Sequence, residues 1–184
     1  MESALPPTPT LKGPRIELVP AQEADRAFVF QAMAQSDITC RMMGPPAFPE
    51  IPVPSWEEFQ EDYEAYFFSD EKPLEGRCFI IWWQNQPIGQ INHNEIYTDI
   101  GQVELDIWLA NSQFTGKGIG PEAVAVLCTY LTREFGCKRF IMAPSARNPE
   151  AVRAYEKAGF SPITYEPPHF IPDYHDTVIL LKEC

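Results

Sequence analysis

A glycine-rich turn between a strand and a helix constrains the fold of this chain more than any other feature. Residues 103–109 alternate branched apolar side chains with acidic or aromatic ones, which predicts a strand with two different faces. The turn leads to Pro121, which stands where the first turn of a helix tolerates proline. Its glycines are Gly116, Gly118 and Gly120.

This turn is typical of a site for anions. The first N–H groups of a helix have no partner within the helix, and the helix dipole adds positive potential there. Glycines let successive N–H groups point into one concavity, where a pyrophosphate group can bind. Lys117 adds a positive charge. An ordinary turn is the alternative for this segment taken alone, because glycines mark such turns as well.

A second helix with a well-defined start follows a short strand predicted at residues 139–142. Residues 148–150, Asn-Pro-Glu, combine a cap residue, a first-turn proline and an acid at the positive end of the helix. The helix should continue to Lys157 or Ala158 and stop at Gly159.

Together, these two segments resemble the acyl-CoA site of the GNAT superfamily of N-acetyltransferases. The resemblance rests on residues 113–118 followed by Asn148, Ala151, Tyr155, Gly159 and Phe160. In element order it covers residues 15–184. Within the superfamily, the second half of the chain looks most like aminoglycoside 6'-N-acetyltransferases, through residues 109–111, 116–118 and 155–160.

The resemblance implies that acetyl-coenzyme A (acetyl-CoA) is the co-substrate and that its pyrophosphate binds the glycine turn. Asn148 would bind the pantetheine arm as well as cap its helix, and the backbone N–H near Leu109 would polarise the thioester carbonyl. The residues expected to bind this cofactor are Leu109, Gln113, Phe114, Thr115, Gly116, Lys117, Gly118, Ile119, Gly120, Asn148 and Tyr155.

Glu104 and Asp106 are the candidates for handling the proton of the acceptor. An alkylammonium group has a pKa near 10, so the amine must lose a proton before it attacks. Residues two apart on a strand share a face, so both carboxylates are expected to line one pocket, where they could bind a cationic acceptor and accept its proton. The resemblance places a general base at Glu104 and an acid that contacts the drug amine at Asp106. We favour Asp106, and solvated strand residues are the alternative.

Tyr155 is the third catalytic candidate, because the resemblance places a phenol beside the leaving sulfur. A phenol is protonated at neutral pH and can donate its proton to a thiolate. A packing tyrosine between helices is the alternative. No cysteine has the surroundings of a nucleophile, so direct attack of the amine on the thioester is expected.

The resemblance implies that the first half of the chain forms much of the acceptor pocket. Residues 38–54 are rich in proline and predict a loop, and residues 56–68 carry an aromatic stripe typical of an amphipathic helix. By family resemblance, Met43 and Tyr66 are expected to reach the acceptor. A surface loop and a core-facing stripe are the alternatives. The other elements predicted are strands at 15–20, 77–84, 87–97, 161–166 and 177–181, and helices at 21–35 and from the glycine turn to Gly136.

This order of elements predicts one α/β domain over residues 15–184. The expected fold is GNAT-like (α+β), with a central, mostly antiparallel mixed sheet and helices on both faces. Residues 1–14 contain four prolines and are expected to form a flexible arm. Gly89 should mark a bulge or a close approach in the hairpin whose turn is predicted at Asn85-Gln86.

The amino-acid composition and net charge limit the kinds of partner that this chain is expected to bind. The formal charge of −12 argues against nucleic-acid binding and favours a cationic substrate or partner, with an acidic surface that serves solubility alone as the alternative. No apolar segment is long enough for a membrane span and no secretory signal is apparent, so a cytoplasmic monomer or homodimer is expected. The five cysteines are expected to be reduced thiols, and His93, His169 and His175 have no metal-site spacing, so no metal is expected.

The predicted function is transfer of an acetyl group from acetyl-CoA to a primary amine of a small cationic acceptor, with aminoglycosides as the most specific hypothesis. An acetyltransferase for protein N-termini or lysines, and an acyl-CoA-binding module without turnover, are the alternatives. The acceptor is the weaker part of this hypothesis, because Ala143 precedes Pro144 where the aminoglycoside enzymes commonly have an acid.

Overall fold

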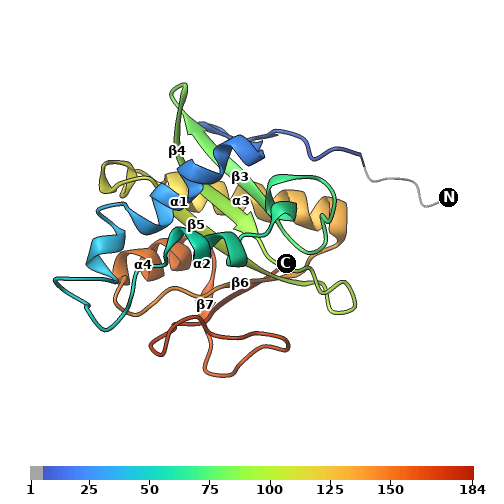
Figure 1. The fold of residues 1–184 in the computed structure, drawn as a ribbon. Helices are drawn as coiled ribbons and strands as arrows, with labels where there is room; N and C mark the ends of the chain where they lie inside the picture. Colours follow the sequence, from blue (N-terminus) through green and yellow to red (C-terminus); the bar gives the residue numbers. More distant parts are fainter. Residues whose placement is uncertain (1–5) are drawn as a thin grey trace.

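The computed structural model describes residues 6–184, which form one mixed sheet of eight strands with helices on both faces (Figure 1). The strand order is β1-β2-β3-β4-β5-β6-β8-β7, and only β5 and β6 are parallel neighbours. The predicted mostly antiparallel sheet is therefore confirmed. The strands are β1 (Leu11–Lys12), β2 (Ile16–Pro20), β3 (Arg77–Trp83), β4 (Gln86–His93), β5 (Gln102–Leu109), β6 (Arg139–Met142), β7 (Ser161–Pro162) and β8 (Leu180–Glu183).

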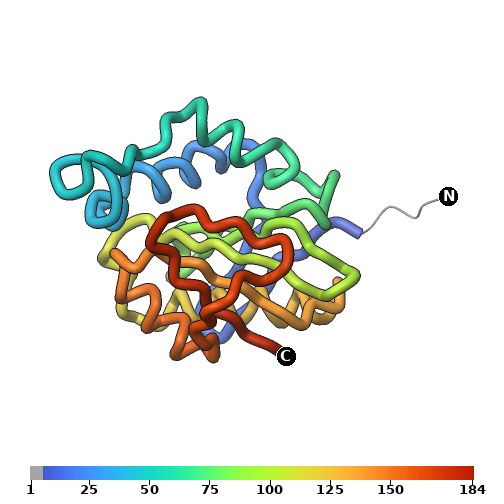
Figure 2. Tube along the Cα trace, turned by 90° about the horizontal axis from the view of Figure 1, so that it is seen from below, coloured from blue at the N-terminus to red at the C-terminus, as the bar shows by residue number. Residues whose placement is uncertain are grey.

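Four α-helices cover the sheet, with α1 and α2 on one face and α3 and α4 on the other (Figure 2). They are α1 (Arg26–Ala34), α2 (Trp56–Asp62), α3 (Ile119–Phe135) and α4 (Pro149–Lys157). Short 3-10 helices occur at Glu23–Asp25, Thr39–Arg41, Ala65–Phe68 and Ser112–Phe114. Within the described residues, no helix has both the length and the apolar character that a membrane span requires.

Strand β3 shows why the sheet needs helices on both faces. Alternate side chains of a strand point to opposite faces, so a strand buried on both sides must be apolar throughout. Phe79 and Ile81 belong to the core beneath α3 and α4, whereas Cys78 and Ile80 pack with Phe59 of α2 on the other side. The apolar run of β3 thus links two separate cores.

Several predicted boundaries are wrong. The strands predicted at 87–97 and 161–166 end at His93 and Pro162. The expected arm over residues 1–14 ends too late, because Leu11 is buried and pairs with Leu18 to make β1, while residues 1–5 lie outside the described part. The turn of the β3–β4 hairpin consists of Gln84 and Asn85, which both have positive φ, as a tight hairpin requires. The last strand is Leu180–Glu183 because its register is set by pairing with β6.

The helix predicted at residues 56–68 is broken at Tyr63. Its backbone leaves the helical region, with φ −99° and ψ 74°. Its carbonyl accepts a hydrogen bond from Nη1 of Arg26 at 2.6 Å instead of one from the next helical turn. The helix predicted at 21–35 likewise starts with a 3-10 turn, and α1 proper begins at Arg26. The guanidinium group of Arg26, at the start of α1, thus links this helix to the end of α2.

A bulge and a close approach of the backbone were expected at Gly89, and both are present. Ile81 pairs with Gly89 and Trp82 with Pro87, so Ile88, next to this glycine on β4, is the extra residue of a β-bulge. A Cβ atom at position 89 would lie 2.5 Å from the carbonyl oxygen of Trp108, so only glycine fits there. The missing side chain therefore lets β4 lie close against the C-terminal end of β5.

Strands β5 and β6 separate, and this separation creates the site. They pair only where Gln102, Val103 and Glu104 meet Arg139, Phe140 and Ile141, although β5 continues for five more residues. Asn94 N–H donates to Glu104 O, and Ala110 N–H donates to Ile88 O. Because main-chain groups alternate along an antiparallel pair, those of Leu105, Ile107 and Leu109 face away from β4, into the gap.

Candidate active site

A cavity of about 1450 Å³ occupies this gap. Its walls come from β5, the 38–54 loop, α2, the glycine turn, the start of α4 and the β7–β8 connection. Of the eleven residues expected to bind the cofactor, Gln113 and Lys117 do not line the cavity. The nine that do are Leu109, Phe114, Thr115, Gly116, Gly118, Ile119, Gly120, Asn148 and Tyr155.

The glycine turn has the geometry of an anion cradle. Gly116 and Gly118 adopt positive φ angles of 71° and 76°, and Gly118 is the cap of α3. The first hydrogen bond of α3 runs from Glu122 N–H to Gly118 O, and Pro121 has no N–H. The N–H groups of Ile119 and Gly120 are therefore the free donors at the positive end of the helix, and both residues line the cavity.

Arg15 supports this turn from outside the predicted motif. Its Nη1 donates to the carbonyl of Lys117 at 2.9 Å, and its Nε donates to Glu122 Oε2 at 2.7 Å. The turn is thus tied to α3 and to the start of β2. Lys117 contributes a carbonyl to this arrangement. The motif alone did not indicate a role for Arg15, because this residue lies about a hundred positions upstream.

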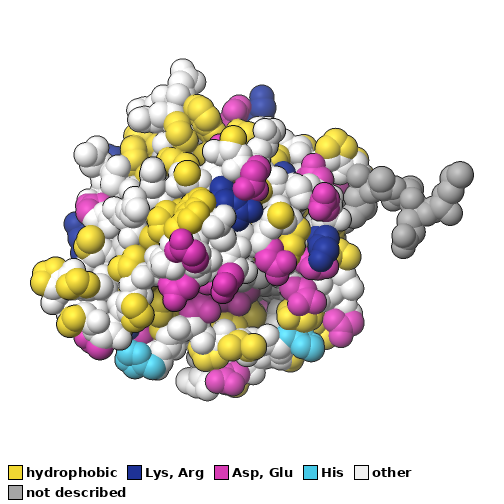
Figure 3. Space-filling model, viewed as in Figure 1, with side chains coloured by type: hydrophobic (Ala, Val, Ile, Leu, Met, Phe, Trp, Pro, Cys, Tyr) yellow, Lys and Arg dark blue, Asp and Glu magenta, His cyan; other side chains and the backbone are white. Residues whose placement is uncertain are grey.

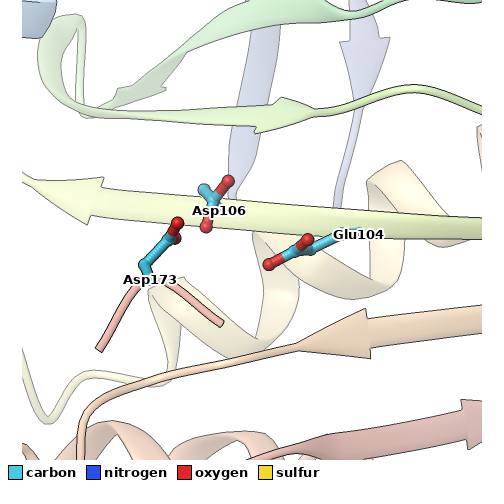
Figure 4. A group of neighbouring side chains, drawn as sticks. All are labelled: Glu104, Asp106 and Asp173. Carbon is cyan, nitrogen blue, oxygen red and sulfur yellow. The ribbon is translucent and has the colours of Figure 1, made fainter. Parts of the chain in front are cut away.

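Three acids meet on the other side of the cavity (Figure 4). Carboxyl oxygens of Glu104, Asp106 and Asp173 all lie within 4.8 Å of one another, and Asp106 also accepts a hydrogen bond from Asn94 Nδ2 at 3.1 Å. They form the one group of three or more Asp, Glu, His or Cys side chains in residues 6–184 that is close enough to share a cation. Figure 3 shows further acidic side chains around a hollow on this face.

Glu104 and Asp106 share a face of β5, as expected, but they line different cavities. Asp106 and Asp173 line the large cavity, whereas Glu104 lines a cavity of about 70 Å³ behind it. The two cavities are neighbours that share Asn94 and Glu95 in their walls, and the two carboxyl groups meet between them. Glu104 lies at the smaller one because it pairs with Ile141 of β6, whereas Asp106 lies beyond the point where the strands separate.

The acids affect the proton affinity of one another. Burial and the charges of Asp106 and Asp173 raise the pKa of Glu104. Burial and the charge of Asp173 raise the pKa of Asp106, although hydrogen bonds from Asn94 and Asn92 oppose this shift. Desolvation and the charge of Asp62 raise the pKa of Asp173. Acids with raised pKa values at a cavity wall are typical of groups that transfer protons.

Tyr155 lies on α4, is 8% exposed and lines the large cavity. Burial, the nearby charge of Asp106 and the neighbouring Tyr174 raise its pKa, so its phenol stays protonated at neutral pH. The cap predicted at Asn148 is confirmed, because its side chain accepts a hydrogen bond from Ala151 N–H at 3.2 Å. Its Nδ2 donates to the sulfur of Met42 at 3.3 Å, which brings the 38–54 loop to the start of α4.

The acceptor side includes residues that sequence analysis did not select. Met43 and Tyr66 line the large cavity, where they were expected, but so do Asp62, Asp173 and Tyr174. Asp62 is indistinguishable from the solvated acids of α2 by spacing alone. Asp173 and Tyr174 belong to the proline-rich β7–β8 connection, which has no periodicity from which a position could be predicted.

Arg147 holds these acceptor walls together. Its Nε donates to the carbonyl of Met42 at 2.9 Å, and its Nη1 lies 2.9 Å from Asp176 Oδ1. Its guanidinium carbon lies 5.4 Å from the ring centroids of both Phe48 and Tyr174. The 38–54 loop and the β7–β8 connection are thereby fixed to the segment before α4.

Comparisons with known proteins agree with this geometry. The family model described as "Acetyltransferase (GNAT) domain" matches residues 15–161. The chain is 34% identical over 79 residues to aminoglycoside N(6')-acetyltransferase type 1 of Klebsiella pneumoniae, a match covering 43% of this chain and 34% of that protein. It is 32% identical over 60 residues to spermine/spermidine N(1)-acetyltransferase of Bacillus subtilis (strain 168), covering 33% of this chain and 40% of that protein. The chain therefore spans only about a third to two fifths of the length of these relatives.

A solved structure extends the likeness to the whole fold. The ribosomal L7/L12 alpha-N-protein acetyltransferase RimL, in complex with coenzyme A, has a TM-score of 0.72 at 18% identity. The match covers 95% of this chain and 98% of that chain. At this identity the likeness concerns the fold alone, and it confirms the expected mixed sheet with helices on both faces.

Proposed function

Since the chain belongs to the GNAT acetyltransferase domain family, we propose that it transfers an acetyl group from acetyl-CoA to a primary amine of a small cationic acceptor. One observation carries this proposal. A single cavity joins free N–H groups at a helix start, an unpaired strand edge, a protonated phenol and an acid group, all within reach of one extended molecule.

The residues present fit coenzyme A. A Cβ atom at Gly116 would meet nothing within 4 Å, and one at Gly120 would meet only Ile107 Cδ1, at 3.9 Å, so the space above the turn is open to a ligand. The free N–H groups of Ile119 and Gly120 would hold the pyrophosphate. The main-chain groups of β5 that face the gap would hold the pantetheine arm in place of the missing β6 partner.

The residues of the chain then have separate tasks. Acetyl-CoA, when bound, supplies an acetyl group activated as a thioester. The N–H of Leu109 faces the gap and can donate to a developing oxyanion. Asp106 can accept the proton of the attacking amine, and Tyr155 can donate its proton to the departing sulfur. No residue of the chain needs to become acylated.

The acceptor is proposed to be a small polycation. Its ammonium group would lie against Asp106 and Asp173, and further cationic groups would find Asp62 and the other acids around the hollow (Figure 3). The match to the Klebsiella pneumoniae enzyme favours an aminoglycoside, and the match to the Bacillus subtilis enzyme favours a polyamine. Both classes carry several ammonium groups, which fits a chain with a charge of −12.

The test is a thiol-release assay with acetyl-CoA and a panel of aminoglycosides, polyamines and peptides with free N-termini. We expect the highest kcat/KM with members of the two polycation groups. Turnover with peptides alone would favour the protein acetyltransferase. Coenzyme A binding without thiol release by any amine would favour the non-catalytic module. Calorimetry that detects no coenzyme A binding would contradict the whole proposal.

A further inference from the structure

Three amide side chains form a row along β4 on the sheet face that α1 and α2 cover. Gln90 and Asn92 are 0% and 1% exposed, and Asn94 is partly buried just beyond the end of the strand. Asn92 pairs with Cys78 of β3, which belongs to the core beneath α2, and with Asp106 of β5. Burying an amide in an apolar core costs free energy unless its polar atoms are hydrogen-bonded. The partners of this row therefore indicate what it does.

A chain of hydrogen bonds joins the row to Asp106. The hydroxyl of Tyr63 donates to Asn92 Oδ1 at 3.1 Å. Asn92 Nδ2 donates to Asn94 Oδ1 at 2.9 Å, and Asn94 Nδ2 donates to Asp106 Oδ2 at 3.1 Å. The direction of the chain follows from its last member, because an ionised carboxylate only accepts hydrogen bonds. Asn94 must then present its oxygen to Asn92, and Asn92 must present its own oxygen to the phenol.

Tyr63, the first donor of the chain, is held both at its backbone and at its ring. Its carbonyl accepts the hydrogen bond from Arg26 that breaks the helix, and its ring stacks on Phe59 with the centroids 4.8 Å apart. Burial and the nearby charge of Asp106 raise the pKa of Tyr63 well above its usual value, so the hydroxyl keeps its proton at neutral pH. The chain thus begins at a fixed donor.

The titratable groups around Asp106 do not favour its negative charge. They are the acids Glu104 of β5 and Asp173 of the β7–β8 connection, and the phenols of Tyr63, Tyr155 and Tyr174. Within residues 6–184, no lysine or arginine forms an ion pair with Asp106. A buried carboxylate in such surroundings depends on hydrogen-bond donors to stay ionised. The amides of β4 supply these donors.

We propose that Tyr63, Asn92 and Asn94 form a positioning chain, which holds Asp106 ionised and fixes its carboxylate for the acceptor amine. This inference rests on the proposed function, in which Asp106 accepts the proton of that amine. Each donor of the chain points toward Asp106, so the chain stabilises the form of this acid that can act as a base. The three residues act through Asp106, which is the group that meets the acceptor.

Nuclear magnetic resonance of the free protein tests the chain without any turnover. The carboxyl carbon of Asp106 is followed against pH in protein labelled with ¹³C-aspartate. Asp106→Asn identifies its resonance, and Asp99→Asn, which alters an exposed acid between β4 and β5, should leave that resonance in place. Asn94→Ala removes the last donor, so the pKa of Asp106 should rise by about one unit, as expected when a charged group loses a hydrogen bond. Gln86→Ala, at an exposed amide of β4, is the matched control, and an unchanged pKa in Asn94→Ala would overturn the proposal.

Tyr63→Phe tests whether these residues act as one chain. It removes the hydroxyl and keeps the stacked ring, so the pKa of Asp106 should rise, but by less than in Asn94→Ala. In the variant that carries both changes, the rise should equal that of Asn94→Ala alone, because both changes break the same chain. Rises that add together would mean that the phenol acts independently of Asn94, which contradicts the chain. Tyr165→Phe, at an exposed tyrosine, should change nothing.

Steady-state kinetics connects the chain with the proposed function. The acid limb of kcat/KM against pH reports the base of the free enzyme, so in Asn94→Ala it should move to higher pH by the same amount as the pKa of Asp106. Coenzyme A affinity should be retained. Activity that falls equally at every pH, with the acid limb unmoved, would make Asn94 a structural residue and overturn the proposal. If the resonance shifts as expected but no amine supports thiol release by the unaltered protein, the proposed function fails and the chain stands.

Discussion

At the scale of single residues, the proposed chemistry depends most on Asp106. Asp106→Asn keeps the shape of the side chain but cannot accept a proton at neutral pH, so we expect turnover to fall about 100-fold or more. Cofactor affinity should be retained, because Asp106 lies on the acceptor side of the cavity. Steady-state kinetics with the best amine, together with calorimetry of coenzyme A binding, measures both quantities. Asp99→Asn is the control, and unaltered turnover in Asp106→Asn would make Asp106 a structural residue.

Tyr155 allows a prediction with a pH signature. Tyr155→Phe removes the proton donor while keeping the buried ring, so transfer should slow by roughly tenfold or more at neutral pH. A thiol has a pKa of about 8.5, so the leaving sulfur needs a proton less as the pH rises above that value. The deficit of the variant should therefore shrink at alkaline pH. A deficit that is equal at every pH would indicate a packing role.

The residues that could be predicted are those whose position follows from local rules. Asn148 could be found because a cap and a proline define the helix start, and Asp106 because strand alternation places it beside Glu104. Asp173 and Arg15 could not be found. Their positions depend on an irregular connection and on a contact between segments about a hundred residues apart, which no periodicity encodes.

At the scale of elements, the start of α3 makes cofactor binding separable from folding. Gly120 has no positive φ, and an added Cβ would meet only Ile107 Cδ1, at 3.9 Å. Gly120→Ala should therefore fold at least as stably as the unaltered chain, because alanine favours a helix more than glycine does. If this turn binds pyrophosphate, the added methyl group should weaken coenzyme A binding by tenfold or more, about 1.4 kcal/mol.

Gly118→Ala is the matched comparison for that prediction. Gly118 has φ 76°, and an added Cβ would lie 3.2 Å from Nη2 of Arg15, so this variant should lose stability as well as affinity. Thermal unfolding and calorimetry on both variants separate the two effects. Unchanged coenzyme A affinity in Gly120→Ala would place the pyrophosphate elsewhere.

The order of elements was predictable, whereas their ends were often not. Alternation and caps identify β5, α3 and α4 well, because these rules act over a few residues. The break at Tyr63 depends on Arg26, which takes the carbonyl that a continuing helix would use. The separation of β5 from β6 is equally invisible in sequence, although it creates the cavity, because it results from where two distant strands stop pairing.

At the scale of the whole molecule, the site should cost stability in a pH-dependent way. Glu104 and Asp106 have raised pKa values in the folded protein, so the folded state holds protons that the unfolded state releases near pH 4. The stabilisation from these groups is complete below that range and is lost as the pH rises through their folded pKa values. The free energy of unfolding should therefore fall between weakly acidic and alkaline pH.

Glu104→Gln tests this cost, because glutamine keeps the size of the side chain and carries no charge. Urea unfolding across a series of pH values should show a weaker pH dependence in the variant, which should be more stable than the unaltered protein at alkaline pH by ~1 kcal/mol or more. Asp99→Asn should follow the unaltered protein throughout. If the free energy of unfolding has the same pH dependence in Glu104→Gln and in the unaltered protein, this carboxyl group has the same pKa in the folded and unfolded states. The acids would then be ordinary solvated surface groups and not a site in which like charges repel each other in the absence of a bound cation.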